Sequence, residues 1–242
     1  MIKLKDILFE NSAPNLLIPR RLEGRLEKYV QATIQKYIKD GGVGTLDLSE
    51  LNLIKLPNNL KNIVVGGDFN CGSNNLTSLQ GVPTSVGGDF YCSNNNLTSL
   101  QGAPTRVGGN FDCGSNKLTS LQGAPTSVGG NFNCDFNKLT SLQGAPTRVD
   151  GGFYCYSNNL TSLQGAPTRV DRDFSCHSNK LTSLNGAPTS VGGDFYCSSN
   201  NLTSLDNAPT SVGGGFYCHN NTKKFTEDGV REVCDVKGTI YV

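Results

Sequence analysis

The sequence lacks the patterns on which most enzyme active sites depend. Its 242 residues include two histidines, and they contain no glycine-rich phosphate loop opening a helix, no H-E-x-x-H and no G-x-S-x-G. These absences argue against nucleotide-dependent enzymes, zinc peptidases and serine hydrolases. His177 and His219 stand in repeated positions, away from any candidate nucleophile. We therefore expect no enzymatic activity, no cofactor and no metal site.

Long hydrophobic runs and an excess of charge of one sign are also missing. No run could cross a bilayer, and the first residues hold no apolar stretch long enough for a secretory signal. The net charge is +1, so the chain as a whole offers no electrostatic reason to bind nucleic acid or an anionic membrane. The sequence therefore predicts a soluble protein without either partner.

A repeat of 21 residues fills most of the chain. Its unit reads V-G-G-D-F-x-C-x-x-N-x-L-T-S-L-Q-G-A-P-T-x. A fixed period of this length indicates a small supersecondary unit stacked on copies of itself, each burying the apolar face that its neighbour leaves open. The chain is therefore predicted to be a solenoid. The residues that mark its register are Phe69/Cys71, Phe90/Cys92, Phe111/Cys113, Phe132/Cys134, Phe153/Cys155, Phe174/Cys176, Phe195/Cys197 and Phe216/Cys218.

The centre of the unit, F-x-C-x-x-N-x-L-x-x-L, resembles the leucine-rich repeat family in its short form, with phenylalanine and cysteine in place of two leucines. A glycine such as Gly87 stands where the family has the first leucine of each repeat. The resemblance covers residues 46 to 222. It implies an α/β solenoid with nine parallel strands on a concave face, and a concave face that binds a protein partner. We expect a monomer.

Each recurring position of the unit has a predicted structural role. Because strand side chains alternate between faces, Phe and Cys of F-x-C point inward, and the two leucines that follow close the core. The asparagine is expected to bond backbone groups of its own and the adjacent coil, which would otherwise be buried unpaired. The glycine pair before each strand, such as Gly87 and Gly88, is expected to adopt positive φ.

Nine cysteines raise the question of disulfides or a metal site. Neighbouring coils lie about 4.8 Å apart, but parallel Cβ vectors in register do not offer the crossed geometry of a disulfide. A ladder of thiols also diverges along an axis, whereas zinc needs ligands that converge. Reduced core thiols are therefore favoured, and they indicate a reducing compartment such as the cytoplasm. Cys234 lies outside the ladder, in the predicted C-terminal cap.

The segment before the repeats is predicted to cap the first coil, as terminal units of repeat proteins must. A tail of residues 1 to 17 precedes a cap of residues 18 to 45, in which apolar residues recur at helical spacing from Arg20 to Lys39. Basic side chains on this helix leave contact with nucleic acid or a membrane as an alternative. The interleaved Glu23 and Glu27 favour an ordinary solvated face.

Residues 223 to 242 are predicted to close the other end of the solenoid. A short helix is expected from Phe225 to Val233 with Thr226 as its N-cap, followed by a strand from Gly238 to Val242. The first coil, which begins at Leu46, is two residues longer than the others.

The first residues, MIKLKDILFE, resemble the short leader peptides of internal head proteins of T4-like phages, which end in an aliphatic-x-Glu cleavage site. Leu8-Phe9-Glu10 matches that site, with Asn11 as the new N-terminus. The repeats also resemble those of phage-encoded proteins. These resemblances imply cleavage after Glu10 and a place in a phage virion, and the alternative is an ordinary chain terminus.

One face of the predicted sheet varies from coil to coil while the rest of each unit hardly changes. The variable positions lie between Phe and Cys and directly after Cys, and they carry the mixture of Tyr, Ser, Gly and Asn found in binding paratopes. A central hot spot is expected where Tyr154 and Tyr156 flank Cys155. Alternatively, the tyrosines simply cover a sheet and raise its β-propensity. The residues predicted to bind a partner are Tyr91, Asp112, Asn133, Asp135, Phe136, Tyr154, Tyr156, His177, Tyr196 and Tyr217.

Two functions of different classes are compatible with these features. The first is a non-enzymatic binding module that captures a protein, which is a bacterial host protein if the gene is viral. The second is a structural or internal phage virion protein, delivered to the host, whose repeats act as a rigid spacer. The tyrosine-rich face favours the first function and the leader-like N-terminus favours the second.

Overall fold

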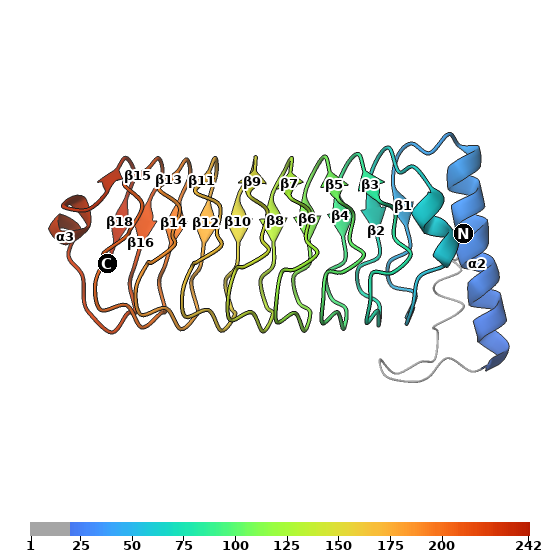
Figure 1. Cartoon of the computed structure of the whole chain (residues 1–242), viewed down its shortest axis with the longest axis horizontal. Helices are drawn as coiled ribbons and strands as arrows, with labels where there is room; N and C mark the ends of the chain where they lie inside the picture. Colours follow the sequence, from blue (N-terminus) through green and yellow to red (C-terminus); the bar gives the residue numbers. More distant parts are fainter. Residues whose placement is uncertain (1–19) are drawn as a thin grey trace.

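The computed structural model of the chain describes residues 20–242. The repeats wind into coils that lie side by side along the long axis of the molecule (Figure 1). Each coil contributes one short strand to a parallel sheet of ten strands, paired in register with the equivalent residues of its neighbours. These strands are β1 (Leu46–Asp47), β2 (Phe69–Asn70), β4 (Phe90–Tyr91), β6 (Phe111–Asp112), β8 (Phe132–Asn133), β10 (Phe153–Tyr154), β12 (Phe174–Ser175), β14 (Phe195–Tyr196), β16 (Phe216–Tyr217) and β18 (Ile240–Tyr241).

This architecture confirms the predicted parallel solenoid, with leucine-rich-repeat-like coils of 21 residues. Nine of the ten strands come from the repeats, and β18 is the closing strand predicted near the C-terminus. The longer first coil is also present, because Leu46 pairs with Phe69 across two extra residues.

A second set of short strands was not predicted. A dipeptide that ends in valine, Ser-Val or Arg-Val in the repeats and Asp-Val in the C-terminal cap, forms parallel pairs with adjacent coils, with its valine buried and its polar residue turned toward solvent. These strands form two separate four-stranded sheets. One contains β3 (Ser85–Val86), β5 (Arg106–Val107), β7 (Ser127–Val128) and β9 (Arg148–Val149), and the other contains β11 (Arg169–Val170), β13 (Ser190–Val191), β15 (Ser211–Val212) and β17 (Asp235–Val236).

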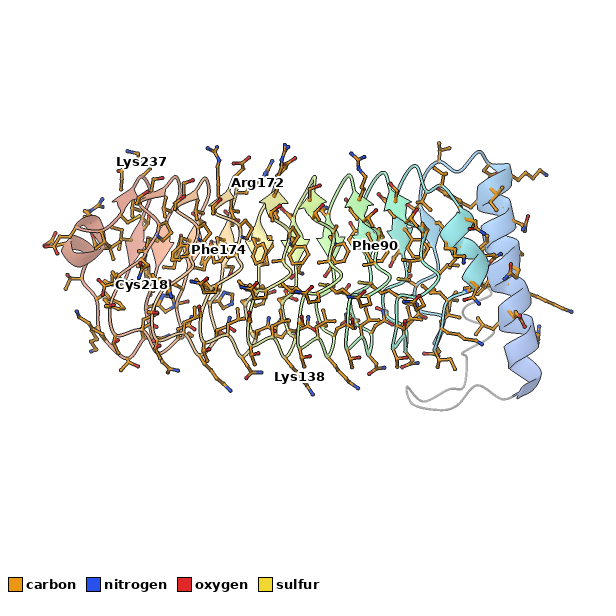
Figure 2. The ribbon with its side chains drawn as sticks, in the orientation of Figure 1. Phe90, Lys138, Arg172, Phe174, Cys218 and Lys237 are labelled. Atoms are coloured by element: carbon orange, nitrogen blue, oxygen red, sulfur yellow. The ribbon has the colours of Figure 1, made fainter. Side chains whose placement is uncertain are left out.

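The predicted column of phenylalanine, cysteine and leucine forms the core. The eight repeat phenylalanines are fully buried, and neighbouring rings have centroids 5.1 to 5.8 Å apart. Figure 2 shows Phe90 and Phe174 inside the coils. Burial of each such ring contributes about 1.5 to 3 kcal/mol, so the repeated column is the main source of stability.

The repeated asparagine makes the contacts that its position predicted. Asn116 Nδ2 donates to the carbonyl oxygens of Cys113 in its own coil and Cys92 in the preceding coil, at 3.1 and 3.0 Å. Its Oδ1 accepts a hydrogen bond from Leu97 N–H at 3.0 Å. The amide therefore satisfies buried backbone groups of two coils, and this row of side chains belongs to the scaffold.

The prediction for the glycine pair before each strand was wrong. Gly87 and Gly88 do not have positive φ, which occurs instead at glycines such as Gly102, with φ of 89°. A Cβ on Gly87 would lie 2.2 Å from the carbonyl oxygen of Gly66 in the preceding coil. The pair is therefore needed for close packing between coils and not for backbone conformation.

Both ends of the solenoid carry helices. The predicted N-terminal helix is α2 (Arg20–Lys39), which buries Val30 and Ile34 in the core, whereas Ile38, predicted on the same face, is 47% exposed. The 3-10 helix η1 (Asn58–Asn62) follows in the first coil. At the other end, α3 (Glu227–Arg231) is shorter than predicted, and its N-cap Thr226 accepts a hydrogen bond from Gly229 N–H, as expected.

Residues 1 to 17 and the predicted cleavage after Glu10 lie outside the described residues. From residue 20 onward, no helix has the length and apolar character needed to cross a membrane.

All nine cysteines are buried free thiols. Burial disfavours the thiolate and raises the pKa of every one, well above its ordinary value at Cys92 and Cys155 and to about 11 at Cys218 and Cys234. Their shared role is packing.

Candidate binding face of the ten-stranded sheet

Two rows of side chains cover the outer face of the ten-stranded sheet. Parallel strands in register stack equivalent side chains about 4.8 Å apart, so most tyrosines here are half-buried against their neighbours. The first outward row, between Phe and Cys, is Asn70, Tyr91, Asp112, Asn133, Tyr154, Ser175, Tyr196 and Tyr217. The second outward row, directly after Cys, is Gly72, Ser93, Gly114, Asp135, Tyr156, His177, Ser198 and His219.

Tyrosines of the first outward row turn toward the glycine pairs, at the edge where Arg172 lies in Figure 2. Tyr91 donates its hydroxyl to Asp89, and Tyr196 donates to Asp194 at 2.7 Å. The hydrogen bond to Asp89 raises the pKa of Tyr91 to about 12, with burial adding to the shift. Burial alone would raise the pKa of Asp89, but its hydrogen bonds lower it. These tyrosines are therefore anchored through their hydroxyls.

Shorter side chains of the first outward row turn to the opposite edge. Asp112 Oδ1 accepts a hydrogen bond from Gly114 N–H at 2.9 Å, and Asn133 Oδ1 accepts one from Asp135 N–H at 3.1 Å. The Asp135 side chain lies over Gly114, since a Cβ there would be 2.2 Å from its Oδ1. These three predicted site residues thus engage groups of the chain itself, and burial raises the pKa of Asp112.

Tyr154 and Tyr156 point to different parts of the face, although one hot spot was predicted around both. Tyr154 leans over Gly152, where a Cβ would lie 2.6 Å from the tyrosine hydroxyl. Tyr91 and Tyr196 donate to an aspartate two residues before them, but that position is Gly152 here, and the Tyr154 hydroxyl donates to Asp173 in the next coil, at 3.4 Å. The predicted cluster is therefore divided, with Tyr154 beside the glycine edge.

Phe136, Tyr156 and His177 form what we call the central aromatic cluster. The rings of Phe136 and Tyr156 meet edge to face with centroids 5.3 Å apart. Tyr156 stacks on His177 at 4.5 Å with an interplanar angle of 10°. His177 is held in turn by Ser175, whose Oγ lies 2.7 Å from His177 Nδ1. The cluster joins three adjacent coils into a continuous aromatic surface.

Phe136 occupies an unfavourable backbone position. Its φ is 46°, in the left-handed region that serine or asparagine occupies in the other repeats, as at Ser115 and Ser157. This conformation costs about 1 to 2 kcal/mol for an L-residue with a bulky side chain. The ring is nevertheless 55% exposed, so the free energy gained by burying it offsets only part of the cost of the backbone conformation. Strain and exposure together single out Phe136 among the predicted site residues.

The central aromatic cluster is uncharged near neutral pH. Burial, with a smaller contribution from His219, lowers the pKa of His177 and so favours the neutral imidazole. Burial followed by the nearby Asp135 carboxylate raises the pKa of Tyr156 to about 12. The cluster therefore offers neutral aromatic rings bordered by the Asp112 and Asp135 side chains.

A second aromatic group lies at the C-terminal end of the same face. Tyr196 stacks on Tyr217 with centroids 4.6 Å apart, and Tyr217 is 6.5 Å from Tyr241. His219 meets Tyr241 edge to face at 4.8 Å. Tyr241 and His219 were not among the predicted site residues. The signal for Tyr241 was the Ile-Tyr pair that continues the Phe-Tyr register into the C-terminal cap.

Possible metal ligands do not gather on the described part of this face. In the part of the chain that the structure describes, no group of three or more His, Cys, Asp or Glu side chains is placed to hold a metal ion. The ring contacts and hydroxyl bonds described above suit recognition of another surface.

The chain has little sequence similarity to known proteins. No protein-family model matches the chain, and no curated protein resembles it in sequence. The solved structure of YopM from Yersinia enterocolitica WA-314 is similar, with a TM-score of 0.48 and 19% sequence identity, over 88% of this chain and 53% of that of YopM. The chain thus spans about half the length of YopM.

Proposed function

We propose that the chain is a non-enzymatic protein-binding module, and that the central aromatic cluster is the core of its binding site. Phe136 carries this proposal, because a strained backbone position and an exposed ring occur together in one repeat, where the seven other 21-residue repeats have serine or asparagine and the first coil has Glu50. Aromatic side chains near the centre of an interface supply most of its binding energy. The second aromatic group would extend the contact along the sheet.

A protein fits this face better than a nucleic acid does. The cluster offers rings on which bases would stack, but the Asp112 and Asp135 carboxylates beside it would repel phosphates. Neutral aromatic rings with small polar neighbours are the composition of protein-binding paratopes. We infer a protein partner, from the bacterial host if the gene is viral. Monomeric state, cytoplasmic or virion location and cleavage after Glu10 stay predictions.

Replacement of Phe136 by serine separates binding from folding. The Phe136→Ser variant places the residue of the other repeats at this turn, so we expect capture of the partner to fall at least about tenfold. Its free energy of unfolding should stay within about 1 kcal/mol of the parent, because relief of backbone strain offsets the lost ring contact. Quantitative mass spectrometry of proteins captured from bacterial lysate, with urea unfolding in parallel, measures both effects.

Ile54→Ser is the matched control for this experiment. Ile54 is 69% exposed and lies in the first coil, so this variant removes a comparable apolar side chain away from the cluster. Captured proteins should be the same for Ile54→Ser and the parent chain. Equal capture by Phe136→Ser would contradict the proposed site.

A further inference from the structure

The row of inter-coil hydrogen bonds made at the glycine pairs is interrupted beside Tyr154. In six coils, three successive residues donate their N–H groups to the preceding coil. In five of these coils the donors are the glycine pair and the residue after it, and in the sixth they are Asp150, Gly151 and Gly152. Gly192 donates to Val170 O, Gly193 to Arg172 O and Asp194 to Asp173 Oδ1. At residues 171–173, none of these three bonds is formed, and this is where the two four-stranded sheets separate.

The sequence at this coil accounts for the interruption. Asp171 and Arg172 replace the glycine pair. Asp150 holds the position of Asp171 in the preceding coil and still donates to Val128 O, so Arg172 is the change that distinguishes this coil. A Cβ at the equivalent Gly193 would lie 2.2 Å from Asp173 Oδ1 and 2.9 Å from the carbonyl carbon of Arg172. The coil that carries β9 and the coil that carries β11 therefore cannot approach each other as closely as other neighbouring coils do. The third bond also lacks an acceptor in this coil. In other coils, a side-chain oxygen of the preceding coil accepts it, as Asn131 Oδ1 accepts from Gly152 N–H at 2.7 Å. Gly152 has no side chain that could accept from Asp173 N–H.

Three successive backbone donors are consequently released toward the gap. Within residues 20–242, the N–H groups of Asp171, Arg172 and Asp173 have no hydrogen-bond partner. In the other coils, the N–H groups at these three positions point toward the preceding coil. Those of residues 171–173 therefore face the space beside β9. Free N–H groups at the edge of a sheet form a concave site for anions and other acceptors.

A cavity of about 330 Å³ opens at this gap, and Tyr154, Asp171, Arg172 and Asp173 line it with Asn131. The Arg172 side chain is exposed and forms no ion pair with any described residue. It lies at the edge of the solenoid in Figure 2. A guanidinium beside free N–H groups is suited to bind a carboxylate through two parallel hydrogen bonds.

The two carboxylates at the rim already have partners. Asp171 Oδ1 accepts from Arg169 Nε at 2.7 Å. Asp173 accepts from Asp194 N–H at 2.9 Å and from the Tyr154 hydroxyl at 3.4 Å. Arg169 offsets the charge of Asp171, and Arg172 offsets that of Asp173 in the lining of the cavity. Arg172 and the three N–H groups are the hydrogen-bond donors of the cavity that have no partner among the described residues.

We propose that this cavity binds a carboxylate group, such as the Asp or Glu side chain or the chain terminus of a protein partner. Arg172 would pair with the carboxylate oxygens, and the backbone N–H groups of residues 171–173 would donate to them. The site lies at the glycine edge, apart from the central aromatic cluster, and the inference does not depend on the function proposed for that cluster.

Titration of the full chain with sodium acetate, followed by ¹H–¹⁵N NMR, tests this site. We expect saturable chemical-shift changes at the amides of Asp171, Arg172 and Asp173, and none with acetamide, the neutral analogue. Arg172→Gln should weaken acetate binding at least about fivefold. Arg106→Gln is the matched control, because Arg106 is an exposed arginine that forms no ion pair within residues 20–242 and its coil keeps all three bonds. The affinity of this variant for acetate should equal that of the parent.

Restoration of the glycine pair provides a second test. Asp171→Gly combined with Arg172→Gly should close the gap, abolish the saturable shifts and slow hydrogen exchange of the amides at 171 and 172 by about 100-fold. The proposal is overturned if acetate gives no saturable shift in the parent chain, if acetamide gives the same shift, or if the double variant binds acetate as the parent does.

Discussion

Raising the pH to about 10 is expected to unfold the chain cooperatively, because unfolding exposes a column of buried thiols to water and allows them to ionise. Seven of the cysteines are fully buried, and burial raises their pKa above the ordinary value of 9.0. A group whose pKa is raised in the folded state stabilises the protein below its unfolded pKa, and that contribution is lost as the pH rises above it. Each thiol then costs about 1.4 kcal/mol one pH unit above 9.

The thiols act together, so their combined effect approaches the whole stability of the protein. Seven thiols remove about 10 kcal/mol at about pH 10, compared with about 5 to 15 kcal/mol for a typical domain. Circular dichroism and thiolate absorbance recorded against pH should change together in one steep transition. A gradual rise in thiolate absorbance with unchanged circular dichroism would show that the cysteines ionise in the folded chain.

A cysteine variant isolates the thiol contribution from that of other groups. In the Cys92→Ala/Cys155→Ala double variant, the loss of unfolding free energy between neutral pH and about pH 10 should be smaller by about 3 kcal/mol. The comparison uses the change with pH in each protein, because both substitutions also leave cavities that lower stability at every pH. An unchanged pH dependence would exclude these two thiols from the linkage.

Removal of one ring from the phenylalanine stack is the second large effect. Phe132 is fully buried, with its ring centroid 5.4 Å from that of Phe111 and 5.3 Å from that of Phe153. Phe132→Ala should therefore lower the free energy of unfolding by about 3 to 5 kcal/mol, through lost burial and the cavity left between two coils. The midpoint of urea unfolding measures this change.

Phe136→Ser serves as the control for Phe132→Ala. It also deletes a phenyl ring, four residues further along, but from an exposed position. Relief of the backbone strain at Phe136 accounts for about 1 to 2 kcal/mol of the difference between the two variants, and the remainder reflects the burial of Phe132. A urea midpoint unaffected by Phe132→Ala would place that ring outside the core.

The sequence was sufficient to predict the parts of the fold that depend on register. A strict period places Phe132 and its equivalents on the same side of successive strands, and it places Asn116 and its equivalents at the same turn. The helix at residues 20–39 and the Thr226 cap were predicted because their signals are local. The short second strands escaped prediction because each buries only its valine, whereas F-x-C buries two alternate residues, Phe and Cys.

The candidate site was predicted only in part. The alternation of side chains along each strand turns the residues beside Phe and Cys away from the core, but it does not show that Tyr154 and Tyr156, expected in one cluster, lie apart. Their separation depends on Gly152, which gives room for the Tyr154 ring, and on Asp173 in the next coil, which accepts its hydroxyl. Contacts of this kind join residues about one repeat apart and differ between coils, so the repeat pattern does not specify them.

The sequence by itself determined the solenoid, its inward column and its variable face, because hydrophobic burial follows from a period that every coil repeats. Only the tertiary structure decided where side chains on the face turn, that Phe136 is strained, and that the bonds between coils fail at Asp171 and Arg172. These features arise from steric fit between particular neighbouring coils, and atoms a few ångströms apart across that contact belong to residues about one repeat apart in the chain.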